Sequence, residues 1–199
     1  MENSRTVSFG RAWERLETWM ELHAPDDYRA LQLPASSEAI SAITNEEFPV
    51  CSELQELLRL HDGVVDIRGG ADPGSFLPSG YGLYSARRMR AAHQRMVENV
   101  SWSIEDGTMD DVIGKSAHVK WVPFAGDVTG QELIIDHRPG STYGSVMEYD
   151  ESAGRYEPKW GTLAHFLNEL TEALENTGRV GYLAPRLRGD SLSIEWYIP

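Results

Sequence analysis

The histidines of this sequence are not spaced as a metal or acid–base site requires. His165 and Glu169 stand one helical turn apart, as many metal ligands do, but His165 lies beside the apolar stripe of a predicted helix and has no further ligand nearby in the sequence. His61 and Asp62 could form half of an acid–base pair. Because His61 falls at the predicted C-terminal end of a helix, where the helix dipole favours a cation, a capping role explains it.

The single cysteine and the carboxylates of the second half form no recognisable catalytic set. Cys51 precedes a predicted helix N-terminus, a position that lowers the pKa of a thiol, but no partner histidine can be assigned to it. Asp127, Asp136 and His137 could hold a cation for a hydrolase, although Asp127 suits a turn and Asp136 the end of a strand. The motifs of serine hydrolases, zinc peptidases and nucleotide-binding loops are absent. We therefore predict no catalytic residues, no metal and no cofactor, and keep a metal-dependent hydrolase as an alternative.

Apolar residues at helical spacing predict five helices that would position these side chains. The first covers residues 9–23 and the last residues 163–176, and both have a continuous apolar face. The predicted N-terminal caps of the second to fifth helices are Ser36, Ser52 in a capping box with Gln55, Ser85 and Thr162. Residues 101–114 are acidic and poor in apolar side chains, so they are predicted to form a surface loop.

From residue 119 the spacing of apolar residues changes to that of strands. Strands are predicted over residues 119–122, 132–136 and 145–149, with a short one near 155–156, and the alternating tail 191–197 is predicted to join the sheet edge. We expect an α+β fold, with a mainly antiparallel sheet and helices packed around it. Because no linker divides the chain, we predict one domain over residues 1–199, with a core at about 13–178 and a C-terminal extension at 179–199.

Composition restricts the partners that this chain could have. The 199 residues carry a formal net charge of −13, which disfavours direct contact with nucleic acid and favours a basic protein. The alternative explanation is that the negative net charge serves only to keep the protein soluble. The absence of a long apolar run and of a secretion signal, together with one unpaired cysteine, predicts a cytoplasmic protein that does not span or bind a membrane.

Acidic residues in two predicted loops are the candidate contacts for a basic partner. We expect their charge to accelerate the encounter of the two proteins. The candidates are Asp62, Asp66 and Asp72 in the first loop and Glu105, Asp106, Asp110 and Asp111 in the second.

The order of several short motifs resembles that of the SUKH superfamily, the Smi/Knr-type proteins. The helix that ends in Leu60-His61-Asp62-Gly63 is followed by a Leu-Pro-Ser-Gly-Tyr segment at residues 77–81. A Trp-x-Pro-Phe-Ala strand and its turn then occupy residues 121–130. The motif residues with an expected structural role are Leu60, His61, Asp62, Gly63, Trp121, Pro123, Asp127, Gly130, Asp136 and Gly144. The turn at residues 127–130 has fewer glycines than is usual in this family.

The resemblance covers about residues 13–178 and implies both a fold and a function. It implies an α+β domain without shared catalytic residues. Members include bacterial immunity proteins, which neutralise toxins that are often nucleases, and fungal regulators of cell-wall synthesis. We therefore expect a non-catalytic, cytoplasmic immunity protein that binds a basic bacterial polymorphic toxin, with a regulatory or scaffold protein as the alternative. The oligomeric state is not predicted.

Overall fold

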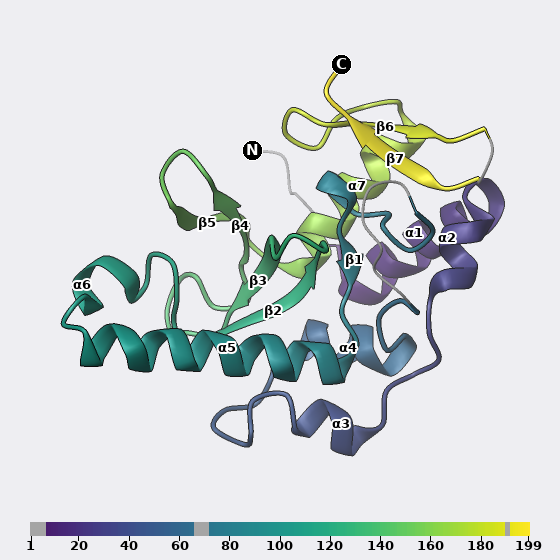
Figure 1. Ribbon diagram of the computed structural model, residues 1–199. Helices are drawn as coiled ribbons and strands as arrows, with labels where there is room; N and C mark the ends of the chain where they lie inside the picture. Colours follow the sequence, from purple (N-terminus) through teal and green to yellow (C-terminus); the bar gives the residue numbers. More distant parts are fainter. Residues whose placement is uncertain (1–6, 66–71, 190–191) are drawn as a thin grey trace, which may run out of the picture.

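A five-stranded antiparallel sheet forms the centre of the computed structural model, which describes residues 7–65, 72–189 and 192–199 (Figure 1). The strands are neighbours in chain order: β1 (Gly82–Leu83), β2 (Trp121–Gly126), β3 (Glu132–Asp136), β4 (Val146–Asp150) and β5 (Arg155–Trp160). Every residue of β2 and β3 is buried, because helices and loops cover both faces of the sheet. The predicted α+β fold is confirmed.

Helices α1 (Phe9–His23) and α7 (Leu163–Glu175) pack against each other and agree with the predicted spans. The apolar stripe of α1 is buried at Trp13, Leu16 and Met20. Phe166 of α7 contacts Phe124 of β2, so the two helices cover one side of the sheet. Three shorter helices complete the N-terminal half: α2 (Pro25–Ala30), α3 (Ser37–Ser41) and α4 (Ser52–Leu60).

Helix α5 (Ala86–Glu105) crosses the sheet near β2 and is longer than predicted (Figure 1). Its C-terminal half packs with Trp121, Ile134 and Met147 through Met96 and Val100. The predicted loop over residues 101–114 is wrong in its first part, because the buried stripe of α5 continues to Ser103. A short helix, α6 (Met109–Val112), follows it. Within the described residues no helix is both long and apolar enough to cross a membrane.

The start of α4 also differs from the prediction. The N-cap is Cys51 and not Ser52, and no side-chain capping hydrogen bond is made there, so the expected capping box does not form. The Cys51 N–H, which precedes the first turn, donates instead to His137 Nε2 at 3.0 Å. Gln55 donates to the Val50 carbonyl at 2.5 Å. A histidine from the end of β3 thus replaces the local cap.

The C-terminal extension forms its own two-stranded sheet from β6 (Ala184–Leu187) and β7 (Ile194–Tyr197), so its predicted place at the main sheet edge is wrong. Asp27, which is fully buried, accepts hydrogen bonds from the Gly74 N–H at 2.8 Å and the Ile194 N–H at 2.7 Å. Trp196 Nε1 donates to the Phe76 carbonyl of the segment before η1 (Pro78–Gly80). These bonds hold β7 against the N-terminal helices.

Candidate protein-binding groove

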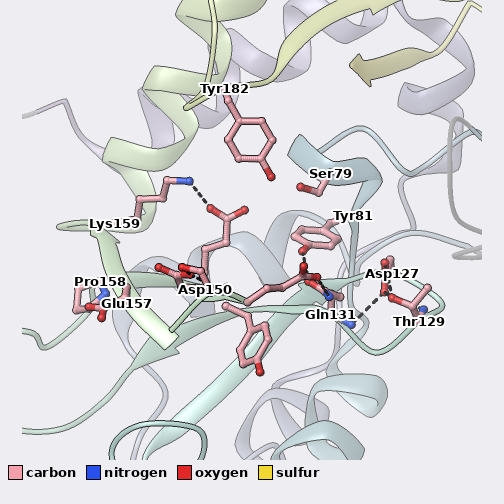
Figure 2. A pocket seen from close by; sticks show the side chains of 14 residues that line it. Ser79, Tyr81, Asp127, Thr129, Gln131, Asp150, Glu157, Pro158, Lys159 and Tyr182 are labelled. Carbon is pink, nitrogen blue, oxygen red and sulfur yellow. Dashed lines mark hydrogen bonds and ion pairs between the residues drawn. The ribbon is translucent and has the colours of Figure 1, made fainter. Parts of the chain in front are cut away.

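An open cavity of about 650 Å³ lies between the β2–β3 turn, the β4–β5 hairpin and the segment before β6 (Figure 2). It is lined by five carboxylates, three tyrosines and one lysine, together with smaller polar residues. The carboxylates are Asp127, Glu148, Asp150, Glu151 and Glu157, the tyrosines are Tyr81, Tyr149 and Tyr182, and the lysine is Lys159. We call this cavity the acidic groove.

Asp127 and Gly130 shape one wall of the acidic groove. The Asp127 carboxylate accepts hydrogen bonds from the Thr129 N–H at 2.8 Å and the Gln131 N–H at 3.0 Å, which fixes the tight turn. Gly130 has a φ of +94°, a left-handed conformation that glycine adopts without strain. Asp127 therefore has a structural role in the turn, and both of its carboxylate oxygens are hydrogen-bonded where it lines the groove.

The opposite wall is the β4–β5 hairpin. Asp150 accepts hydrogen bonds from the Ser152 hydroxyl and from two backbone N–H groups of the turn, and the Ser152 bond is the main reason that the pKa of Asp150 lies below its usual value. Glu151 accepts from Gln131 Nε2 at 2.7 Å, so the two turns are joined across the groove. Glu148 forms an ion pair with Lys159 on the neighbouring strand, as Figure 2 shows.

The electrostatic environment of the groove is negative. The pKa of Tyr81 is raised above its usual value by burial and also by the nearby carboxylates of Glu148 and Asp127. Tyr182, which is 59% exposed, reaches toward the cavity from the other side (Figure 2). Ser79 stands at the rim with a φ of +65°, a strained conformation for a residue other than glycine.

These side chains suit the binding of a cation. Carboxylates form ion pairs with ammonium and guanidinium groups, and tyrosine rings stack on them. The residues that line the groove include no histidine or cysteine, and hence no group with an ordinary pKa near neutrality that could act as a general base. The arrangement therefore favours recognition of lysine or arginine side chains.

The alternative hydrolase site does not assemble. Asp127 lies at the β2–β3 turn, whereas Asp136 and His137 lie at the other end of β3. Because a strand rises roughly 3.3 Å per residue, the length of β3 keeps Asp127 apart from the other two. Asp136 is buried; burial raises its pKa, but hydrogen bonds from Arg138 outweigh this and keep the pKa below its usual value. Burial lowers the pKa of His137 to about 4, so its ring is neutral. Within the described ranges, no group of three His, Cys, Asp or Glu side chains could hold a metal ion.

The remaining chemical candidates have structural partners. Cys51 is buried, and burial raises the pKa of its thiol to about 11, which disfavours a nucleophilic role. The His61 backbone caps α4, and its ring nitrogens face the Gln32 carbonyl at 2.9 Å and Glu17 Oε1 at 3.0 Å. Glu169 accepts a hydrogen bond from Trp160 Nε1, while His165 is exposed to solvent.

The predicted acidic contacts are not all on one surface. Asp62 accepts a hydrogen bond from the Ala86 N–H at 2.6 Å and so helps to cap α5. Asp72 is half-buried in a turn, and Asp66 lies outside the described residues. The exposed residues Glu105, Asp106, Asp110 and Asp111 surround the other end of α5, about 30 Å away along the helix axis. None of these residues lines the acidic groove, which the sequence prediction missed.

The motif residues mostly shape the chain. Gly63 has a φ of +72°, and a Cβ there would lie 2.5 Å from the backbone of Tyr84 and Ser85, so only glycine fits. Gly144, at a φ of +82°, donates its N–H to the Asp136 carbonyl. Trp121 is fully buried and Pro123 lies beside a bulge in β2, whereas Leu60 is 41% exposed. The motif thus marks turns and strands of the fold, and of its residues with an expected structural role only Asp127 lines the groove.

The model of the SMI1 / KNR4 family (SUKH-1) matches residues 34–169, which is more than half of the chain. The matched region runs from the segment before α3 into α7 and includes both turns that form the walls of the groove. β6 and β7 lie beyond the matched residues. A search of curated proteins found no match.

Proposed function

Because the chain belongs to the SMI1 / KNR4 family (SUKH-1), we propose that it is a non-catalytic protein-binding module that acts as a cytoplasmic immunity protein. Its target would be a basic domain of a bacterial polymorphic toxin, such as a nuclease. The family is generally non-catalytic and includes both immunity proteins and Knr4-type regulators. Family membership supports the class of function, and the acidic groove supports the choice of a basic protein target.

The observation that carries this proposal is the composition of the groove. Five carboxylates and one lysine line a cavity that also presents three tyrosines, and its turns are fixed by side-chain hydrogen bonds. A fixed groove loses little conformational entropy when a partner binds. A nuclease binds phosphates through lysine and arginine side chains. The lysine and arginine side chains of the toxin would enter the groove. They could then no longer bind the phosphates of the nucleic-acid substrate, so the toxin would be inhibited.

A regulatory or scaffold role is the second candidate, and the C-terminal extension favours it. The extension lies outside the matched residues and exposes Leu187, Tyr197 and Ile198, at 43%, 37% and 72%. Exposed apolar side chains of this kind are common in interaction surfaces. In this reading a cellular protein, and not a toxin, would bind the exposed side chains of the extension.

Co-expression with the product of the neighbouring gene tests the proposed function. Wild-type chain should restore growth and should be recovered in a complex with that product. The variant Glu151→Gln/Glu157→Gln removes two groove charges, and Glu14→Gln/Glu21→Gln removes two exposed charges from α1 as a matched control. We expect the groove variant to weaken binding by at least about tenfold and the control to have little effect.

The two roles give different results in this experiment. A complex that forms without any effect on growth would favour the regulatory role. Failure to find either a complex or growth rescue would contradict the immunity role, since mutual recognition of the two proteins is its basis.

A further inference from the structure

Trp102 stands out among the tryptophans because it is exposed. It is 59% accessible, whereas Trp13 and Trp121 are at most 1% accessible. The residues that neighbour it on the surface of α5, one turn before and one turn after, are Glu98 and Glu105 with Asp106 at the C-cap. An indole ring therefore lies among three carboxylates at the end of a helix.

The adjoining helix α6 extends this surface. Met109 is 47% exposed, and Asp110 and Asp111 are both exposed beside it. Together with Glu98, Trp102, Glu105 and Asp106, these residues form what we call the α5 tip. α6 follows directly from the C-terminal end of α5, as Figure 1 shows. None of these residues lines the acidic groove, so the α5 tip is a separate surface.

The charges on α5 are opposite to those that stabilise a helix. Arg87 and Arg88 lie in its first turn, where the dipole favours anions. Glu105 is its last residue and Asp106 its C-cap, where the dipole favours cations. In the part of the chain that the structure describes, Glu105, Asp106 and Asp110 form no side-chain hydrogen bond or ion pair, while Asp111 lies 3.7 Å from Lys115. Helix stability therefore does not account for this acidic end.

We propose that the α5 tip docks an arginine-bearing segment of the partner protein, with the guanidinium stacked on Trp102. A planar guanidinium can stack on an indole and bind a carboxylate in the same plane, which an ammonium group does less well. Glu98, Glu105 and Asp106 lie about one helical turn from Trp102 and would hold the charge. This inference rests on the proposed function in one respect: the partner is a basic protein. The surface and the preferred side chain are new.

A short capped peptide of alternating arginine and glycine is the probe, with the lysine–glycine peptide as its comparison. Binding at about 50 mM salt is followed by NMR through the Trp102 indole N–H. We expect this signal to shift with the arginine peptide and to shift less with the lysine peptide. Trp102→Leu retains apolar area but loses the aromatic face, and it should weaken arginine-peptide binding by about three- to fivefold.

The groove variant Glu151→Gln/Glu157→Gln serves as the control and should keep the Trp102-dependent binding. Equal peptide affinity in wild type and Trp102→Leu would overturn the proposal, as would an indole signal that does not move. A partner complex that forms and is unaffected by Trp102→Leu would also overturn it, while leaving the proposed function intact. Conversely, Trp102-dependent binding of the arginine peptide would support the α5 tip even if the neighbouring gene product forms no complex.

Discussion

Asp27 in the interior and Glu105 at the α5 tip are both acidic, but their surroundings differ in every respect. Asp27 is fully buried and its two carboxylate oxygens accept hydrogen bonds from the backbone of Gly74 and Ile194. Glu105 is exposed and, in the described part of the chain, has no hydrogen-bond or ion-pair partner. The same contrast separates Asp62, which caps α5 at one end, from Asp106 at the other.

This comparison shows that the acidic residues behind the net charge of −13 have different roles. Some of the acidic side chains accept hydrogen bonds from backbone N–H groups that have no carbonyl partner, and so hold distant segments together. Their removal should destabilise the fold. Those at the α5 tip oppose the helix dipole, so their removal should stabilise it. Acids of the second kind are the ones left free for a partner. The carboxylates that line the groove already have partners within the protein and would share them with a bound cation.

Asp27→Ala should give the largest loss of stability, about 2–4 kcal/mol, because two buried N–H groups lose their acceptor. Chemical denaturation would measure the loss, and amide exchange at Ile194 should accelerate. Burial raises the pKa of Asp27 to about 6, so the folded state binds a proton more tightly than the unfolded state. The Asp27 side chain should therefore add stability as the pH falls from about 6 to 4, measured as the difference between the wild type and a variant that does not titrate at this position. Asp27→Asn, the matched control, is that variant; a difference that stays constant over this pH range would contradict the assignment.

His137 should produce the opposite pH dependence. Burial lowers the pKa of His137 to about 4, below its ordinary value of 6.5, so the unfolded state binds the proton more tightly. This side chain should contribute up to about 3 kcal/mol that is present above pH 6.5 and is lost as the pH falls to 4. His137→Gln retains an acceptor for Cys51 but does not titrate. The stability difference between this variant and the wild type, measured by denaturation, should shrink as the pH falls from 6.5 to 4. A constant difference would show that the His137 ring is not the source of the pH dependence.

Asp62→Ala should reduce stability by about 1–2 kcal/mol, since the Ala86 N–H at the start of α5 loses its acceptor. Asp62→Asn keeps an acceptor and should cost only a fraction of this. Thermal denaturation of the two variants would separate capping from charge. If the alanine variant were as stable as wild type, Asp62 would return to the set of acids that are free to bind a partner.

The smallest effect, with the opposite sign, is expected at the α5 tip. Glu105→Gln/Asp106→Asn should stabilise the protein by about 0.3–1 kcal/mol, because each substitution removes a negative charge from the negative end of a helix. The gain should decrease at high salt, which screens exposed charges. A loss of stability would show that these carboxylates have a structural role and would remove the contrast with Asp62.

The sequence predicted the elements whose evidence is local. The apolar stripes of α1 and α7 and the apolar run in β3 each lie within one element, and their spans agree with the structure. What was missed depends on contacts between distant residues. The His137 bond to Cys51 joins residues 86 apart, and the Asp27 bond to Ile194 joins residues 167 apart. No local pattern predicts either pairing.

The acidic groove shows the same limit. Glu148, Asp150, Glu151 and Glu157 are concentrated around one hairpin, which is a signal that the sequence contains. However, the groove exists because Asp127 and Tyr182 are brought opposite that hairpin by the fold. Asp62 is both a candidate contact on the basis of charge and a motif residue with an expected structural role, and in the structure it caps a helix. Charge in a sequence does not distinguish an acid that has a backbone partner from one that does not.

Calorimetric titration of the chain with the neighbouring gene product tests the central claim most directly. The account predicts a complex whose affinity falls at least about tenfold in Glu151→Gln/Glu157→Gln, changes little in Glu14→Gln/Glu21→Gln, and decreases as salt is raised. Equal affinities for the groove variant and the wild type, or an affinity that does not depend on salt, would contradict recognition of a basic protein by the acidic groove.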